Sequence, residues 1–223
     1  MKTQGNFDRL AKYYRLLEYF TFGRALERAR YAHLDHLRNC RSILILGEGD
    51  GRCLAKLVHI APQAQIECLD FSQAMLARAA QRIVGTAAVS RVTFRIANLL
   101  TESLPPAHYD AVVTFFFLDC FTTPEADALL LRIHRSLKPE ALWLWADFAL
   151  PTQGYPRVRA RFWLTILYFC FRWETGMSAR KLPSVEPFFA AHGYRPIAMN
   201  SFQLGLVASI AWQTPPAGLS RLN

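Results

Sequence analysis

The pattern of apolar and polar positions changes near residue 41. Residues 7–38 contain no proline and one glycine, Gly23, and apolar residues at 7, 10, 14 and 17 recur at helical spacing. From residue 41 onward, short apolar runs alternate with amphipathic stretches that end at glycine or proline. The pattern predicts one or two N-terminal helices, broken near Gly23, followed by alternating strands and helices.

The alternation predicts an α/β fold with a doubly wound, Rossmann-like sheet. Strands are expected over 41–46, 65–69, 91–97, 111–117 and 141–145, and helices over 52–60, 73–84, 125–137, 157–173 and 184–192. Two more strands, around 194–200 and 203–212, have no helix between them and must therefore be antiparallel. We expect one domain whose sheet is mostly parallel, with an antiparallel last strand.

Composition and charge narrow the class of protein. The 223 residues are 52% hydrophobic and 19% charged, which indicates a globular chain. Its five cysteines, at 40, 53, 68, 120 and 170, form no C-x-x-C pair and lie near no histidine cluster, so we expect reduced thiols and no metal site. The N-terminus has no apolar signal segment, and the ten-residue apolar run 162–171 is too short to span a bilayer. We therefore expect a cytoplasmic protein.

The net charge of +9 comes from two segments, 1–42 and 157–181, each with five more Lys and Arg than Asp and Glu. An anionic membrane surface, an acidic substrate or nucleic acid would fit this excess, as would a solvated surface rich in arginine. Nucleic acid fits least, because the chain has no RGG repeat, no RNA-binding strand motif and no dense basic cluster.

A glycine-rich turn carries the first chemical signal. Gly47-Glu-Gly-Asp-Gly51 follows an apolar strand and precedes a helix, and Asp70 ends the next strand 23 residues after Gly47. Glycines allow close approach of a ligand to a helix N-terminus, and a carboxylate at that distance can bind both ribose hydroxyls. The pattern predicts a nucleoside cofactor; the alternative is a tight strand–helix turn with Asp70 as a helix-capping loop residue. Arg52 occupies the third glycine position of the dinucleotide motif, so only G-x-G-x-G is present.

These motifs resemble those of class I S-adenosylmethionine-dependent methyltransferases, over nearly the whole chain. The similar segments are 43–51, Asp70-Phe-Ser-Gln-Ala-Met-Leu76, Ala97-Asn-Leu99, 109–119 and the turn Leu137-Lys-Pro-Glu140. The resemblance implies S-adenosylmethionine as cofactor and S-adenosylhomocysteine as product. It implies cofactor contacts from Gly47, Glu48, Gly49, Asp50, Gly51, Asp70, Phe71, Met75, Asn98, Leu99, Phe115 and Phe116.

Two positions depart from the family pattern. Ile45 stands where an acidic residue often holds the cofactor's ammonium group, so Glu48 or Asp50 would have to supply that charge. Asp50 could equally cap the following helix. Asn98 replaces the usual Asp beside the adenine, although its carbonyl oxygen can still accept a hydrogen bond.

The run Phe7-Asp-Arg-Leu-Ala-Lys-Tyr13 resembles the opening of ubiquinone/menaquinone-type methyltransferases, although Tyr14 replaces a usual Asp. In that group this helix covers the pocket, and Tyr13 would face the reacting methyl; ordinary helix packing is the alternative. The resemblance divides the single domain 1–223 into a helical lid (1–40), a cofactor-binding core (41–150), acceptor-covering helices (151–193) and a final strand pair with a tail (194–223).

Asp119 and Asp147 are the candidate general bases, because each follows a central strand at the edge where open sheets bind ligands. His134 is discounted, since its spacing to Lys138 suggests the surface. No Asn-Pro-Pro-aromatic tetrad follows the fourth strand, which argues against an adenine or glutamine N-methyltransferase.

The segment Arg157 to Lys181 is rich in aromatic residues and is expected to cover an apolar acceptor pocket, to face a membrane or to pack in the core. The predicted acceptor is small and lipophilic: a quinone, a lipid or an aromatic metabolite. The alternatives are an RNA or protein methyltransferase and a non-catalytic module that binds S-adenosylmethionine. The sequence does not predict the oligomeric state.

Overall fold

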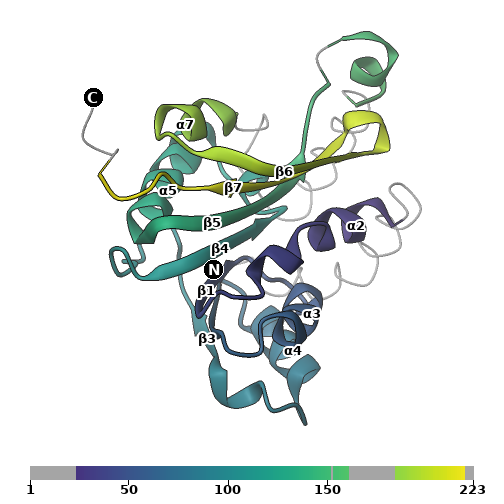
Figure 1. Cartoon of the computed structure of the whole chain (residues 1–223). Coiled ribbons are helices and arrows are strands. Elements are labelled where there is room, and N and C mark those ends of the chain that lie inside the picture. The colour runs from purple at the N-terminus through teal and green to yellow at the C-terminus, as the bar shows by residue number, and fades with distance from the viewer. Residues whose placement is uncertain (1–23, 152, 161–183, 219–223) are drawn as a thin grey trace.

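The computed structural model describes residues 24–151, 153–160 and 184–218, which form a sheet between two layers of helices (Figure 1). The seven strands lie in the order β3-β2-β1-β4-β5-β7-β6. Their bounds are β1 Ser42–Leu46, β2 Gln65–Asp70, β3 Val92–Ile96, β4 Tyr109–Phe115, β5 Leu137–Phe148, β6 Arg195–Phe202 and β7 Val207–Gln213. Strands β1 to β5 are parallel, and β7 is antiparallel to both β5 and β6. The predicted fold class is therefore confirmed.

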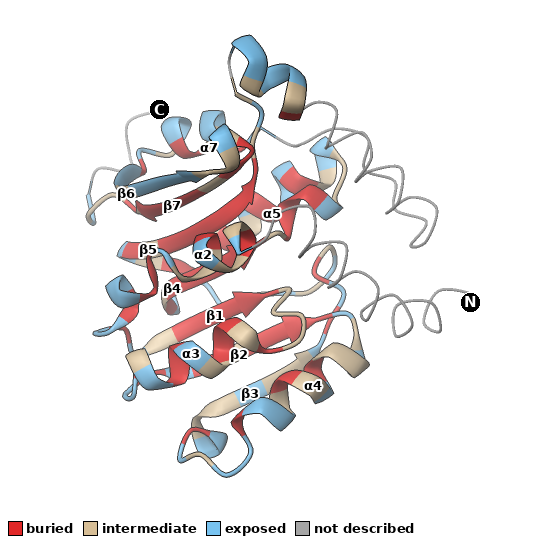
Figure 2. Cartoon of the chain, turned by 90° about the vertical axis from the view of Figure 1, so that its right-hand side faces the viewer, coloured by how far each residue is buried: buried red, intermediate tan, exposed pale blue. Residues whose placement is uncertain are grey.

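The helices divide between the two faces of the sheet. On one face lie α2 (Ala25–Tyr31), the 3-10 turn η1 (Leu34–Leu37), α3 (Arg52–Ile60) and α4 (Gln73–Ile83), and on the other lie α5 (Thr123–Ser136) and α7 (Glu186–Ala191). Because successive strand residues point to opposite faces, Ile43 and Ile45 join the core under α3, whereas Leu44 and Leu46 join the core under α5. The central strands are accordingly buried along their length (Figure 2).

The described part of the predicted lid is built into the core. Leu26 and Ala29 of α2 are buried, and the Ser209 hydroxyl of β7 donates to the Ala29 carbonyl oxygen at 2.8 Å. The buried ring of His33 is hydrogen-bonded through Nε2 to the carbonyl oxygen of the same serine at 3.0 Å. These contacts anchor residues 24–40 on the sheet and fix the position of α2 beside the edge where β1 and β4 end.

The fifth strand differs from its predicted bounds. The turn expected at 137–140 belongs to β5, because Leu137 pairs with Tyr109 and the register shifts between Tyr109 and Ala111. Glu140 takes up the irregularity with a φ of 57°. The preceding helix α5 therefore ends at Ser136, and the strand runs on to Phe148.

One edge of the sheet gathers the segments that matter for chemistry. Strands β1, β2, β4 and β5 all end there, followed by the turns at 47–51, 71–72, 116–122 and 149–151. The 3-10 turn η4 (Gln203–Gly205), which joins β6 to β7, lies at the same edge, because Val207 pairs with Phe148. We call this side of the molecule the carboxyl edge.

Candidate active site

The glycine-rich turn connects β1 to α3 at the carboxyl edge. Gly47, Gly49 and Gly51 have φ values of 67°, 66° and 85°, which side chains rarely adopt. A Cβ on Gly47 would lie 2.6 Å from the Phe117 ring, and one on Gly51 would lie 2.5 Å from the Cα of Ala79. A Cβ on Gly49 would meet no atom within 4 Å. Two glycines therefore permit close packing, whereas Gly49 faces open space.

Asp70 holds this turn from the neighbouring strand. Its buried carboxylate accepts hydrogen bonds from the backbone N–H of Gly49 at 3.4 Å and of Ser72 at 2.9 Å. Burial raises the pKa of Asp70, and the backbone N–H groups oppose that shift. Ser72 in turn caps α4 by accepting from the Met75 N–H. The chain thus places a carboxylate beside the turn, as the spacing of Gly47 and Asp70 predicts.

The two acidic residues of the turn have different roles. The Asp50 carboxylate pairs with Arg52 at 3.2 Å and with Arg82 of α4 at 2.9 Å, so it ties the start of α3 to α4. It does not cap α3, because Gly51 occupies the cap position and supplies no side-chain bond. Glu48 instead accepts from the Leu54 N–H at 2.9 Å, in the first turn of that helix. Burial raises the pKa of Glu48 to about 8.

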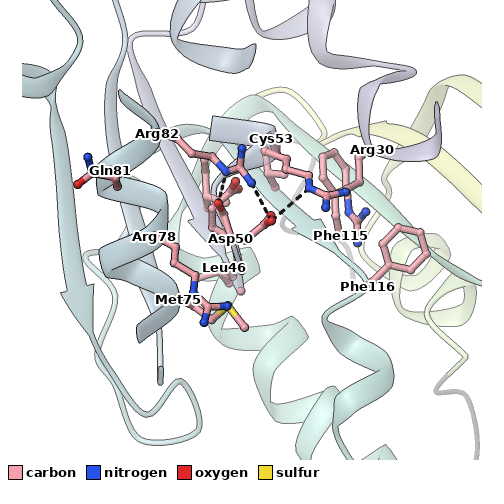
Figure 3. Close-up of a pocket in the computed structure, with 16 residues that line it drawn as sticks. Arg30, Leu46, Asp50, Cys53, Met75, Arg78, Gln81, Arg82, Phe115 and Phe116 are labelled. Carbon is pink, nitrogen blue, oxygen red and sulfur yellow. Dashed lines mark hydrogen bonds and ion pairs between the residues drawn. The ribbon is translucent and has the colours of Figure 1, made fainter. Parts of the chain in front are cut away.

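A cleft of about 440 Å³ opens beside the turn, between α2, α3, α4 and the ends of β1 and β4 (Figure 3). Its lining residues are Arg30, Ile45, Leu46, Gly47, Glu48, Gly49, Asp50, Arg52, Cys53, Met75, Arg78, Gln81, Arg82, Val113, Phe115 and Phe116. Seven of the predicted cofactor residues are among them: Gly47, Glu48, Gly49, Asp50, Met75, Phe115 and Phe116.

The other five predicted cofactor residues lie outside this lining. Gly51 and Leu99 are buried, and Asp70 is buried behind the turn. Phe71 is 62% exposed on the next turn of the carboxyl edge. Asn98 is exposed, and its Oδ1 accepts from the Leu100 N–H at 3.1 Å, which occupies it within its own loop. Tyr13 and most of the segment 157–181 lie outside the described residues.

Sequence reasoning missed the basic side chains of the cleft. Arg30 comes from α2, and its guanidinium lies 4.8 Å from the centre of the Phe116 ring. Arg78 and Arg82 are one turn apart on α4 and both reach the cleft (Figure 3). Their spacing from Met75 on one helix face is the signal that could have found them. Phe116 itself has a φ of 52°, an uncommon conformation that a non-glycine residue adopts at a cost in free energy.

The two candidate bases lie together on the other side of the carboxyl edge. Asp119, in the 3-10 turn η3 (Leu118–Cys120), and Asp147, near the end of β5, are both buried. Asp147 accepts from the N–H groups of Phe148, Leu118 and Asp119. Burial raises the pKa of Asp119 to about 6, and burial together with the Asp119 charge raises the pKa of Asp147. Neither residue lines the cleft.

His134 is not the surface residue that its spacing suggests. It is half-buried on α5, and its Nδ1 is hydrogen-bonded to the Tyr194 hydroxyl at 2.9 Å. The His192 ring lies 4.8 Å away, centre to centre, and burial lowers the pKa of His134. The helix face that seemed exposed is covered by the segment around α7, which lies far away in the sequence.

Sheet order, the antiparallel β7 and the turn after β1 together define the Rossmann-like fold of the methyltransferases. Residues 43–140 match the model of a family described as a methyltransferase domain. Over residues 43–140, the match and the fold agree with the predicted class, the S-adenosylmethionine-dependent methyltransferases. Among residues 24–151, 153–160 and 184–218, no group of three or more His, Cys, Asp or Glu side chains could hold a metal ion.

One curated protein similar in sequence is a malonyl-[acyl-carrier protein] O-methyltransferase of Bacillus cytotoxicus. It is 33% identical over 109 residues, which are 48% of this chain and 35% of that protein. The chain therefore spans about a third of the length of this relative.

Two solved structures show the same fold at low identity. The first is a 1,6-didemethyltoxoflavin-N1-methyltransferase of Burkholderia thailandensis with bound 1,6-didemethyltoxoflavin and S-adenosylhomocysteine (TM-score 0.64, 17% identity, 94% of this chain and 87% of that one). The second is the N-methyltransferase NodS of Bradyrhizobium japonicum in complex with S-adenosylhomocysteine (TM-score 0.60, 16% identity, 85% and 88%). Both structures hold S-adenosylhomocysteine, the product that the predicted cofactor leaves.

Proposed function

We propose that this chain transfers a methyl group from S-adenosylmethionine to a small acceptor. The observation that carries the proposal is the arrangement of Gly49, which lines the cleft, and Asp70, which is buried behind the turn. Gly49 faces open space, and the Asp70 carboxylate behind it already accepts from the Gly49 N–H. A carboxylate has about four acceptor sites, and the N–H groups of Gly49, Ser72 and Phe71 occupy three of them, so Asp70 retains about one site for a ribose hydroxyl.

The residues of the cleft fit the rest of such a cofactor. We assign the ammonium group of its methionine part to Glu48, because Asp50 is engaged by Arg52 and Arg82. Phe71 and Asn98 stand at the same edge for the adenine, although the Asn98 carbonyl oxygen must leave Leu100 to bind it.

When bound, S-adenosylmethionine supplies an electrophilic methyl group on a sulfonium, so the chain has to orient the acceptor and manage its proton. We assign the proton to the pair of Asp119 and Asp147. Two buried carboxyls this close cannot both ionise easily, and the pair therefore holds one proton near neutral pH. In that state one carboxylate can accept a proton from an acceptor hydroxyl, amine or carbon acid. Tyr13 stays a prediction as the group that faces the methyl from the lid.

The acceptor class that we propose is lipophilic. Val113, Phe115 and Phe116 form an apolar wall of the cleft, and an apolar wall suits an aromatic or aliphatic acceptor. A quinone, as in the ubiquinone/menaquinone-type enzymes, is a specific form of this proposal. A carrier-bound acid such as that named for the Bacillus relative, and a small compound such as the 1,6-didemethyltoxoflavin of the Burkholderia structure, are the alternative acceptors. The four described cysteines are free thiols, which supports a cytoplasmic site of action.

Calorimetric titration with S-adenosylmethionine and S-adenosylhomocysteine tests the proposal. We expect micromolar binding that Asp70→Ala abolishes. Asp35→Ala is the matched control, because that carboxylate is exposed and pairs only locally with Arg38. The absence of binding to either compound by the full chain would remove the enzyme and leave only its fold.

A further inference from the structure

An exposed apolar surface lies beside the cleft, at the carboxyl edge of the sheet. Four apolar side chains project there from two segments that follow β5 and β6: Leu150, Tyr155, Val158 and Leu204, with 42%, 73%, 68% and 63% of their surface exposed. We call these four residues the edge patch. Exposure of these apolar side chains to water is unfavourable, and a group of them at one edge indicates an interaction surface.

Hydrogen bonds and a close backbone approach hold the two segments together. Arg159, in the helical stretch 154–160, donates to the Gln203 carbonyl oxygen at 3.1 Å and to its Oε1 at 2.8 Å. The Ala149 N–H donates to the Leu206 carbonyl oxygen at 2.8 Å. A Cβ on Gly205 would lie 3.0 Å from Pro151, so these backbones are also in close contact. The two segments that carry the edge patch are therefore held together and fixed to the sheet.

The backbone at Leu204 is strained, and the leucine side chain adds no packing to the turn. Gln203 and Leu204 have φ values of 52° and 57°, in the left-handed region that favours glycine and asparagine. A leucine here costs conformational energy, and its side chain stays exposed, so packing does not repay the cost. Contact with something outside the chain would.

We infer that the edge patch docks on the surface of a bilayer that contains anionic lipid. The helical stretch 154–160 projects from the body of the molecule (Figure 1), which suits contact with the headgroup layer of a bilayer. Tyr155 is of the type that collects at membrane interfaces, and the exposed Arg157 stands between it and Val158. The net charge of +9 favours the same surface.

The position of the edge patch gives this docking a purpose, which rests on the proposed lipophilic acceptor. Phe148, at the end of β5 next to the patch, contacts the Phe116 ring at 5.4 Å between centres. Phe116 in turn lines the cleft. Packed aromatic rings therefore join the docked surface to the cleft, and docking would bring the cleft close to an acceptor dissolved in the bilayer. In the described part of the chain, no helix has the length and apolarity that crossing a bilayer requires.

Co-sedimentation with vesicles tests the inference. The full chain is mixed at low salt with vesicles of phosphatidylcholine alone and of phosphatidylcholine and phosphatidylglycerol in equal parts. We expect binding to the anionic vesicles, reduced about tenfold by Leu204→Asn, since asparagine tolerates the left-handed turn but buries little apolar area. Val84→Asn is the matched control: Val84 is 62% exposed but lies past the end of α4, at the opposite edge of the sheet. Arg157→Gln should weaken binding about fivefold, and Arg135→Gln on the far end of α5 should not.

Three results would overturn the inference: no wild-type binding to anionic vesicles, an equal loss in Val84→Asn, or a wild-type dimer that Leu204→Asn dissociates, which would make the partner a second copy. Titration of the same samples with S-adenosylmethionine separates this inference from the proposed function. Cofactor binding without vesicle binding overturns the docking surface alone. Vesicle binding without cofactor binding supports the surface and removes the methyltransferase.

Discussion

The assignment of the cofactor's ammonium group to Glu48 predicts that binding releases a proton. Burial raises the pKa of Glu48 to about 8, so at pH 7 roughly nine-tenths of the molecules carry a protonated Glu48. A cation beside the carboxyl favours its ionised form, because opposite charges at short range lower a carboxyl pKa. Binding should therefore release about 0.9 proton from Glu48 at pH 7.

The cofactor's own amine reduces this number slightly. With an α-amino pKa near 8, roughly a tenth of the amine must take up a proton to pair with Glu48, so the net release is about 0.8 proton. The same linkage makes affinity rise between pH 6 and pH 8 and fall again above pH 8, where the amine loses its charge.

Calorimetry in two buffers of different ionisation enthalpy measures this release directly. At pH 7 the apparent heat should differ by about 0.8 times the difference between the buffers' ionisation enthalpies. Glu48→Gln should abolish that difference and weaken binding, because it keeps a hydrogen-bond acceptor for the Leu54 N–H but removes the charge. Equal heats in both buffers for the wild type would refute the assignment and leave Glu48 as a helix cap only.

Two further predictions concern the turn and the buried carboxyl pair. Gly51→Ala should lower the free energy of unfolding by about 2 kcal/mol or more, because its Cβ would clash with Ala79 at a φ of 85°. Gly49→Ala, at a φ of 66° and facing open space, should lower that free energy by about 1 kcal/mol but abolish cofactor binding. Thermal unfolding and calorimetry check both variants, and equal losses of stability would contradict the separate roles of the two glycines. Asp119→Asn should lower the methylation rate about 10²-fold. The wild-type rate should fall as pH drops through about 6, where Asp119 gains a proton and can no longer accept one, and the variant should lack this fall. An unchanged pH profile in the variant would exclude the pair as the base; Asp35→Asn is the control.

The Asp119→Asn substitution should stabilise the folded chain at pH values above the pKa of Asp119. Burial raises the folded pKa of Asp119 above its unfolded value, so the folded state binds this proton more tightly than the unfolded state does. The wild type therefore loses stability as pH rises from the ordinary pKa of 3.8 to about 6. Asp119→Asn should consequently unfold at a higher temperature than the wild type at pH 8. A variant that is more stable and less active would be a sign of a group retained for chemistry.

The spacing of apolar residues and the residues at which each apolar run ends were enough to predict the sheet. Apolar runs that end at Gly47 and Asp70, and a last strand pair without a crossover, determine topology because parallel strands need helical connections and antiparallel ones do not. The bounds of β5 were not predictable in the same way. Pro139 and Glu140 read as a turn, but pairing of Leu137 with Tyr109 across the sheet retains them in the strand. Tertiary pairing overrode the local signal there.

In the site too, local features could be predicted from the sequence, whereas features that depend on contacts between distant residues could not. The glycine-rich turn could be predicted from its residue types, since a turn and a helix start are local structures. The separate roles of Glu48 and Asp50 are not, because they depend on Arg82, which reaches Asp50 from a helix 32 residues away. Arg30, Arg78 and the burial of His134 were missed for the same reason. A carboxylate that is neutralised by arginines loses its attraction for an ammonium, and the choice of Glu48 over Asp50 therefore follows from a contact that only the folded chain shows.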